Sequence, residues 1–124
     1  MARILLAEDD GSLRGFLTRA LERAGHQVID CENGDEAIDA LEHGPYDLLL
    51  TDIVMPGADG IEVARVAAAR QPGLRIMFIT GFAAVTLKAG RAMPNARVLS
   101  KPFHLRDLVL EVDRLFELEA TGLN

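Results

Sequence analysis

The chain has 124 residues, of which 49% are hydrophobic and 26% are charged, and its formal net charge is −6. This length suits one domain with one core, and the composition excludes a disordered chain. No apolar run approaches the ~20 residues of a membrane-spanning helix, and no lysine or arginine cluster indicates a nucleic-acid surface. We therefore expect a protein or a cation as the partner, and neither a membrane nor a nucleic acid.

The amino-terminal segment MARILLAEDD lacks the basic start and the long apolar core of a secretory signal, so we expect a cytoplasmic protein. Cys31 is the one cysteine in the chain, which excludes an internal disulfide. No histidine stands beside Cys31 in the sequence, so we interpret it as a small buried residue of a strand or core.

Short apolar runs alternate with helical patterns along the chain. The expected strands are residues 2–7, 26–31, 47–52, 74–80 and 96–100. The expected helices are a first one with Ser12 as N-cap and Gly25 as its end, then residues 35–43, 60–70, and one from Leu105 to Leu118. The pattern predicts a parallel sheet covered by helices on both faces.

Residues 81–96 carry a weaker pattern, with a glycine at position 90 and a proline at position 94. We expect a short or irregular helix there. No repeat or linker is visible, so residues 1–124 are expected to form a single domain with a short tail at 119–124.

Four of the expected strands end in polar residues. They are Glu8 and Asp9, Asp52, Thr80, and Ser100 with Lys101. In an open α/β sheet, ligands bind beyond these carboxyl ends of the strands. Each acid by itself could be a solvated strand end or a helix cap, but three carboxylates at one edge repel one another unless a cation compensates them. An all-oxygen ligand set favours Mg²⁺, with the Lys101 ammonium as a second source of positive charge.

The other aspartates and the histidines show no such grouping. We interpret Asp10, Asp30, Asp35 and Asp47 as turn or cap residues. His26, His43 and His104 are scattered, one per segment, so we expect surface residues rather than a histidine metal site.

The segments ILLAEDD, LLLTDIVMPGADG, FITGFA and VLSKPF, in this order and spacing, resemble the motifs of response regulator receiver domains. These domains are the phospho-acceptor modules of bacterial two-component signalling, and the resemblance covers nearly the whole chain. It implies a flavodoxin-like (βα)5 fold, with a five-stranded parallel sheet in the order 2-1-3-4-5 and helices on both faces.

The resemblance also implies a role for each polar residue at the sheet edge. Asp52 would be the phosphorylated residue, with a histidine kinase or a histidine phosphotransferase as the donor. Mg²⁺ would be bound by Glu8, Asp9, Asp52 and the backbone carbonyl of Val54. Thr80 would hydrogen-bond a phosphoryl oxygen, Lys101 would pair with the phosphoryl group, and the Lys101–Pro102 bond would be cis.

The chemistry of phosphoryl transfer agrees with these roles. Transfer from a phosphohistidine needs a carboxylate nucleophile in line and cations on the phosphoryl oxygens. We expect the protein to catalyse only its own phosphorylation and dephosphorylation, so it is not an enzyme in the usual sense. Val54 and Phe82 are apolar and cannot orient an attacking water, so we expect slow hydrolysis of the aspartyl phosphate.

Two further features concern the output. Many receivers carry Tyr or Phe where this chain has Val98, which puts the usual threonine-to-aromatic switch in question. The segments ARILLAEDD, FITGFAAV and VLSKPFHLRDLV are similar to the CpdR type of stand-alone receivers from alphaproteobacteria. That similarity implies an adaptor for the ClpXP protease that acts unphosphorylated in cell-cycle control.

We expect the output surface to comprise residues 82–95, the fifth strand and the last helix, with a shallow apolar patch at Ala83, Ala84 and Val98. We expect phosphorylation to weaken the contact made there. The alternative is that partners dock on the first helix, at Arg14, Thr18 and Arg19.

Three other functions stay open. The protein could be a phosphate shuttle in a relay. It could be a phosphatase of the haloacid dehalogenase class, although that class needs a second aspartate where this chain has Val54. A flavodoxin-like cofactor carrier is disfavoured, because residues 8–12 would present carboxylates to a phosphate.

Overall fold

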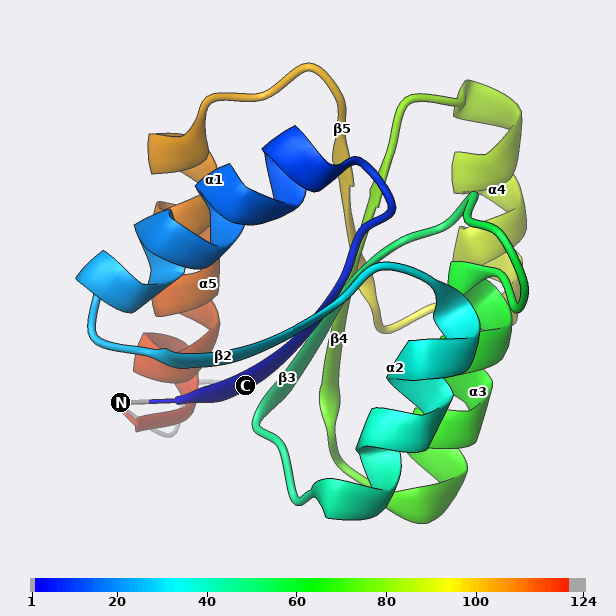
Figure 1. The fold of residues 1–124 in the computed structure, drawn as a ribbon, viewed down its shortest axis with the longest axis horizontal. Coiled ribbons are helices and arrows are strands. Elements are labelled where there is room, and N and C mark those ends of the chain that lie inside the picture. Colours follow the sequence, from blue (N-terminus) through cyan, green and yellow to red (C-terminus); the bar gives the residue numbers. More distant parts are fainter. Residues whose placement is uncertain (1, 121–124) are drawn as a thin grey trace.

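The computed structural model describes residues 2–120, with the backbone alone described at 83–84 and 117–120. Its five strands form one parallel sheet in the order β2-β1-β3-β4-β5, which confirms the predicted topology (Figure 1). The strands are β1 (Arg3–Ala7), β2 (Gln27–Cys31), β3 (Leu48–Asp52), β4 (Arg75–Thr80) and β5 (Arg97–Ser100).

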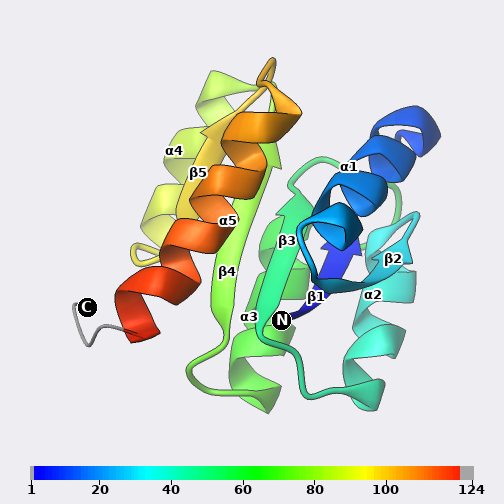
Figure 2. The ribbon, with the colours of Figure 1, turned by 90° about the vertical axis from the view of Figure 1, so that its left-hand side faces the viewer.

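Helices cover both faces of the sheet. Their bounds are α1 (Gly11–Arg23), α2 (Gly34–Ala40), α3 (Gly60–Arg70), α4 (Ala83–Ala92) and α5 (Leu105–Ala120). Helices α1 and α5 lie on one face, and α2, α3 and α4 lie on the other (Figures 1 and 2). A parallel sheet needs this arrangement, because both of its faces are apolar.

Successive strand residues point to opposite faces and so supply two cores. Ile4 and Leu50 pack with apolar residues of α1 and α5. Leu5 and Leu49 pack with apolar residues of α2, α3 and α4. Every residue of β3 is buried, which explains why the strand begins with three consecutive leucines instead of alternating apolar and polar residues.

The helix ends differ in detail from the sequence-based expectation. Helix α1 is capped by Asp10, whose carboxylate accepts a hydrogen bond from the Leu13 N–H at 3.1 Å, so the N-cap is Asp10 and not Ser12. The end of α1 at Gly25 is confirmed, since this glycine has a positive φ of 98°. Helix α2 ends at Ala40, and a short 3₁₀ turn (Leu41–His43) follows it.

Helix α4 is regular over ten residues, so the expectation of a short or irregular helix was too pessimistic. Its capping residue is Met93, and Pro94 then prevents continuation of the helix. Helix α5 reaches Ala120, two residues into the expected tail, and positions 121–124 lie outside the described residues.

His26 was expected at the surface, and this prediction was wrong. Its side chain is 8% exposed. Its Nδ1 accepts a hydrogen bond from the Ala2 N–H at 3.2 Å, which leaves Nε2 to donate to Asp113 at 3.1 Å. His26 therefore connects α5 to the start of β1, whereas His43 and His104 are exposed as predicted.

Cys31 ends β2 as a buried residue, as predicted, and burial raises the pKa of its thiol to about 11. None of the helices within residues 2–120 combines the length and apolarity that a membrane-crossing helix needs.

Candidate functional site

The carboxyl ends of four strands converge at one edge of the sheet. Asp52 is the last residue of β3, and Thr80 is the last residue of β4. Glu8 directly follows β1, and Lys101 directly follows β5. The parallel register pairs Thr80 with Ser100, so the ends of β4 and β5 lie level with each other.

Three carboxylates meet at this edge. Glu8, Asp9 and Asp52 each offer an oxygen, and these oxygens all lie within 4.8 Å of one another. Glu8 is fully buried and Asp52 is 6% exposed, whereas Asp9 faces solvent. An all-oxygen donor set that is open on one side fits a hard divalent cation that keeps some of its waters.

Lys101 supplies positive charge to the same cluster. Its Nζ lies 2.9 Å from Asp52 Oδ2 and 3.1 Å from Glu8 Oε1. Burial lowers the pKa of Lys101, but its hydrogen bonds to Asp52 and Glu8 outweigh that effect and leave the pKa raised. The ammonium therefore stays charged beside the two acids.

Glu8 is held more tightly than a solvated strand end would be. Its Oε2 accepts a hydrogen bond from the Asp10 N–H at 3.1 Å, and the Arg14 guanidinium donates to its backbone carbonyl at 2.9 Å. Burial raises the pKa of Glu8 to about 7, and the nearby Asp52 charge adds to that rise. Without a cation in addition to Lys101, Glu8 is thus only partly ionised at neutral pH.

Asp52 is fixed in one orientation. Its Oδ1 accepts a hydrogen bond from the Ile53 N–H at 2.7 Å, and its Oδ2 faces Lys101. The Thr51 hydroxyl donates to the Asp52 carbonyl at 2.7 Å. A carboxylate held this way loses little freedom when it reacts, which favours its use as a nucleophile.

Thr80 is 1% exposed and is the last residue of β4, three positions before the first residue of α4. Its hydroxyl accepts a hydrogen bond from the Phe82 N–H at 3.1 Å, and its carbonyl accepts one from the Lys101 N–H at 2.8 Å. Phe82 is the N-cap residue of α4. The Thr80 hydroxyl is therefore connected directly to the start of that helix.

The remaining predicted residues flank the cluster. Val54 and Phe82 expose 48% and 60% of their surface. The role of the Val54 carbonyl as a metal ligand stays a prediction, as do the ligand and phosphoryl-binding roles of the other site residues. The Lys101–Pro102 bond is cis, as predicted.

The sequence did not indicate two residues that support the site. Arg14 donates to the Glu8 carbonyl and also lies 3.4 Å from Asp30. Asp35 of α2 accepts a hydrogen bond from the Ala58 N–H at 3.3 Å and so holds the loop that follows β3. Asp35 and Ala58 are 23 positions apart, so no local pattern could have paired them.

The comparisons with known proteins agree with this geometry. The model of the response regulator receiver domain matches residues 4–113. The chain is 58% identical to the response regulator receiver protein CpdR of Brucella abortus, over 93% of this chain and 97% of CpdR. It is 32% identical to the sensor kinase CckA of the same organism, over 94% of this chain and 13% of the kinase.

Among solved structures, the response regulator TrrA of Thermotoga maritima, in complex with Mg²⁺ and BeF, is 30% identical with a TM-score of 0.82. The alignment covers 93% of this chain and 99% of that one. The chain also matches longer transcriptional regulators, of which it covers 47% or less. Since the family model spans most of the chain and the fold agrees with it, the chain belongs to the response regulator receiver domain family.

Proposed function

We propose that this receiver is a stand-alone response regulator that is phosphorylated on Asp52. The observation that carries the proposal is the placement of Asp52. Its Oδ2 lies 2.9 Å from Lys101, and one of its carboxylate oxygens lies within 4.8 Å of oxygens of Glu8 and Asp9. A carboxylate with positive charge on its reactive side is what phosphoryl transfer requires of the acceptor.

In the proposed reaction, an Asp52 oxygen attacks the phosphorus of a phosphohistidine. The P–O bond forms as the P–N bond breaks, and the imidazole leaves. Glu8, Asp9, Asp52 and the Val54 carbonyl would hold Mg²⁺, which neutralises charge on the phosphoryl oxygens when it is bound. Lys101 stands beside Asp52 already and would pair with the transferred group.

The Thr80 hydroxyl would report the phosphoryl group. To donate a hydrogen bond to a phosphoryl oxygen it must turn towards Asp52, which changes its contact with the Phe82 N–H at the start of α4. Val98, at the position of the usual aromatic switch, is half-buried and packs into the core on the α4 side. Its branched side chain has few rotamers, so α4 is the better route for the signal.

The donor would be a histidine kinase or a histidine phosphotransferase. The likeness to the receiver part of the sensor kinase CckA supports a place for this chain in such a relay. A phosphate shuttle is the alternative within the same family. An aspartyl phosphatase is less well supported, because Val54 stands where a second acid would be needed.

The proposed output is a protein contact, as an adaptor for ClpXP proteolysis in the cytoplasm, made mainly by the unphosphorylated form. The likeness to CpdR over nearly the full length of both chains supports this role. The expected surface is residues 82–95 with β5 and α5. Phe82 and Leu87 are exposed within it, while the side chains of Ala83 and Ala84 lie outside the described part.

Phosphotransfer from a radiolabelled histidine phosphotransferase tests the acceptor. The wild-type chain should take up label with Mg²⁺ and lose the ability in excess chelator. Asp52→Asn should abolish uptake, whereas Asp47→Asn, an exposed acid just before β3, should not change it. Equal labelling of the Asp52→Asn variant would contradict the proposal.

Degradation of a ClpXP substrate in vitro tests the output. Adding the unphosphorylated chain should speed degradation, and a beryllofluoride phosphoryl mimic should reduce that effect. Faster degradation with beryllofluoride would contradict the proposed direction. If Arg14→Glu abolished the faster degradation and changes within residues 82–95 did not, the contact would lie on α1 instead.

A further inference from the structure

The charges of the chain are strongly segregated. Residues 63–106 contain eight lysines and arginines and no aspartate or glutamate. All nineteen acids, with five basic residues, lie in the rest of the chain. The acid-free stretch supplies most of α3, all of β4 and α4, and the edge strand β5 (Figure 1).

Within this stretch, α4 carries cations that are not neutralised. Lys88 and Arg91 are exposed, and neither forms an ion pair with any described residue. They are three positions apart on a helix, so their side chains are neighbours. An approaching anionic group therefore meets two uncompensated charges on one helix.

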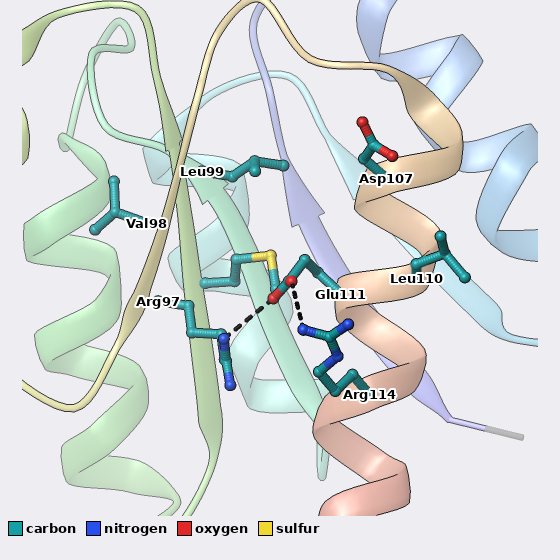
Figure 3. A pocket seen from close by; sticks show the side chains of 8 residues that line it. Arg97, Val98, Leu99, Asp107, Leu110, Glu111 and Arg114 are labelled. Carbon is teal, nitrogen blue, oxygen red and sulfur yellow. Dashed lines mark hydrogen bonds and ion pairs between the residues drawn. The ribbon is translucent and has the colours of Figure 1, made fainter.

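The neighbouring cleft between β5 and α5 is different. It has a volume of about 510 Å³, and Glu111 lies 3.1 Å from Arg97 and 3.5 Å from Arg114 (Figure 3). Asp107 balances the remaining charge of the lining. This cleft therefore offers no net attraction to a charged partner, and Lys88 and Arg91 are not part of its lining.

Leu87 adds an apolar contact to the same face. It is 68% exposed, although Ala89 on the opposite side of α4 is fully buried. Leu87 precedes Lys88 and lies four positions before Arg91, so the three side chains share the outer surface of the helix. We call Leu87, Lys88 and Arg91 the α4 face.

We propose that the α4 face binds an acidic segment of a partner protein. Carboxylates of the segment pair with Lys88 and Arg91, and one of its apolar side chains packs on Leu87. The acidic remainder of the molecule repels such a segment, which steers it to α4. The same acidic remainder repels nucleic-acid phosphates, and Leu87 gives them nothing to pack against, so a protein is favoured over DNA or RNA.

This inference rests on the proposed function, since it names the partner chemistry of the output contact. The link to phosphorylation is the hydrogen bond from the Phe82 N–H to the Thr80 hydroxyl. Phe82 caps α4 without a side-chain hydrogen bond, so a turn of Thr80 acts on the first turn of the helix that carries the α4 face.

The test is a titration of the ¹⁵N-labelled chain, followed by backbone amide shifts. The probes are two synthetic peptides of equal length and equal leucine content, one with glutamates and one with lysines, and a short DNA duplex. The glutamate peptide should shift amides of residues 85–92, and its affinity should fall about tenfold or more in high salt. The lysine peptide and the duplex should leave these amides unchanged.

Matched variants separate a local site from net charge. Replacing Lys88 and Arg91 by glutamate should weaken binding of the glutamate peptide about tenfold or more. Replacing Arg65 and Arg70 of α3 by glutamate makes the same change in net charge. It should weaken binding of the peptide less than about threefold, because only long-range attraction is lost. Leu87→Ser should weaken binding without changing its salt dependence.

Equal losses in the α3 and α4 variants would overturn the proposal, as would tighter binding of the duplex at the same amides or no shift of α4 with the glutamate peptide. The amide of Asp52 serves as a separate readout in the same samples. If it does not respond to beryllofluoride with Mg²⁺, the proposed function fails, whatever the peptides do.

Discussion

The backbone carbonyl of Asp52 lies so close to Gly60 that no side chain would fit at position 60. A Cβ atom added to Gly60 would lie 2.0 Å from the Asp52 carbonyl oxygen. The Gly60 N–H also donates to the Ile53 carbonyl at 2.8 Å. The first residue of α3 thus folds the loop after β3 back onto the strand end, next to the candidate phosphoacceptor.

Gly60→Ala should therefore both destabilise the protein and impair phosphorylation of Asp52, because the loop must move away from the strand end. Gly90→Ala is the matched control, since a Cβ there meets nothing within 4 Å and the position is helical. It should raise the free energy of unfolding by about 0.5–1 kcal/mol. Chemical denaturation and a phosphotransfer assay measure both effects, and unchanged phosphotransfer in Gly60→Ala would count against this reading.

The raised pKa of Glu8 predicts a pH dependence. The folded chain holds the Glu8 proton up to about pH 7, whereas an unfolded chain loses it near 4.5. In metal-free protein, the Glu8 contribution to stability therefore falls as pH rises from 4.5 to 7. Glu8→Gln should remove this slope in denaturation curves.

Mg²⁺ affinity should have the opposite pH dependence. Because the cation competes with the proton on Glu8, the dissociation constant should decrease by up to about tenfold per pH unit below pH 7 and level off above it. Calorimetric titration at several pH values measures this. If the affinity for Mg²⁺ does not change between about pH 5.5 and 8, Glu8 does not bind the cation.

The exposed apolar side chains of Val54 and Phe82 predict a long-lived phosphoryl group. Neither can hydrogen-bond a water on its way to the phosphorus, so general-base assistance is missing. Replacing Val54 by Asn and Phe82 by Gln should speed hydrolysis about tenfold, which is less than the acceleration that a well-positioned general base provides. Release of labelled phosphate measures this, and an unaltered lifetime would show that these two side chains do not control water.

His26 should matter for stability and not for phosphorylation. Its removal in His26→Ala leaves the Ala2 N–H without its partner and cuts the link to Asp113, for a loss of about 1–3 kcal/mol. Ala2 precedes β1, at the end of the strand opposite to Glu8, so phosphotransfer should proceed at the wild-type rate. A stable variant that is slow in phosphotransfer would contradict this assignment.

The parallel sheet with helices on both faces could be predicted because the strands are continuous apolar runs and the helices are strongly periodic, whereas the strand order came from the resemblance to receiver domains. The clustering of Glu8, Asp52, Thr80 and Lys101 followed from the topology, since each ends or follows a parallel strand. The prediction failed where the deciding contact is distant in the sequence. The burial of His26 depends on Asp113, and the loop after β3 depends on Asp35.

Helix α4 was underestimated for a related reason. Gly90 has a low helix propensity, but it lies on the exposed side, while Ala89 and Val85 anchor the helix to the core. The charge segregation is a different case, because its eight basic residues are spread over 44 positions. Which of them stay without an acidic neighbour depends on the fold, which pairs Arg97 with Glu111 and Lys101 with Glu8 and Asp52.

The position of the phosphoryl group tests the central claim most directly. The phosphorylated chain is treated with borohydride, which reduces an aspartyl phosphate to homoserine, and the site is located by peptide mass spectrometry. We predict homoserine at position 52 alone, absent when Mg²⁺ is removed. Homoserine at position 9 or elsewhere, or a phosphoryl group that resists borohydride, would contradict the assignment of Asp52.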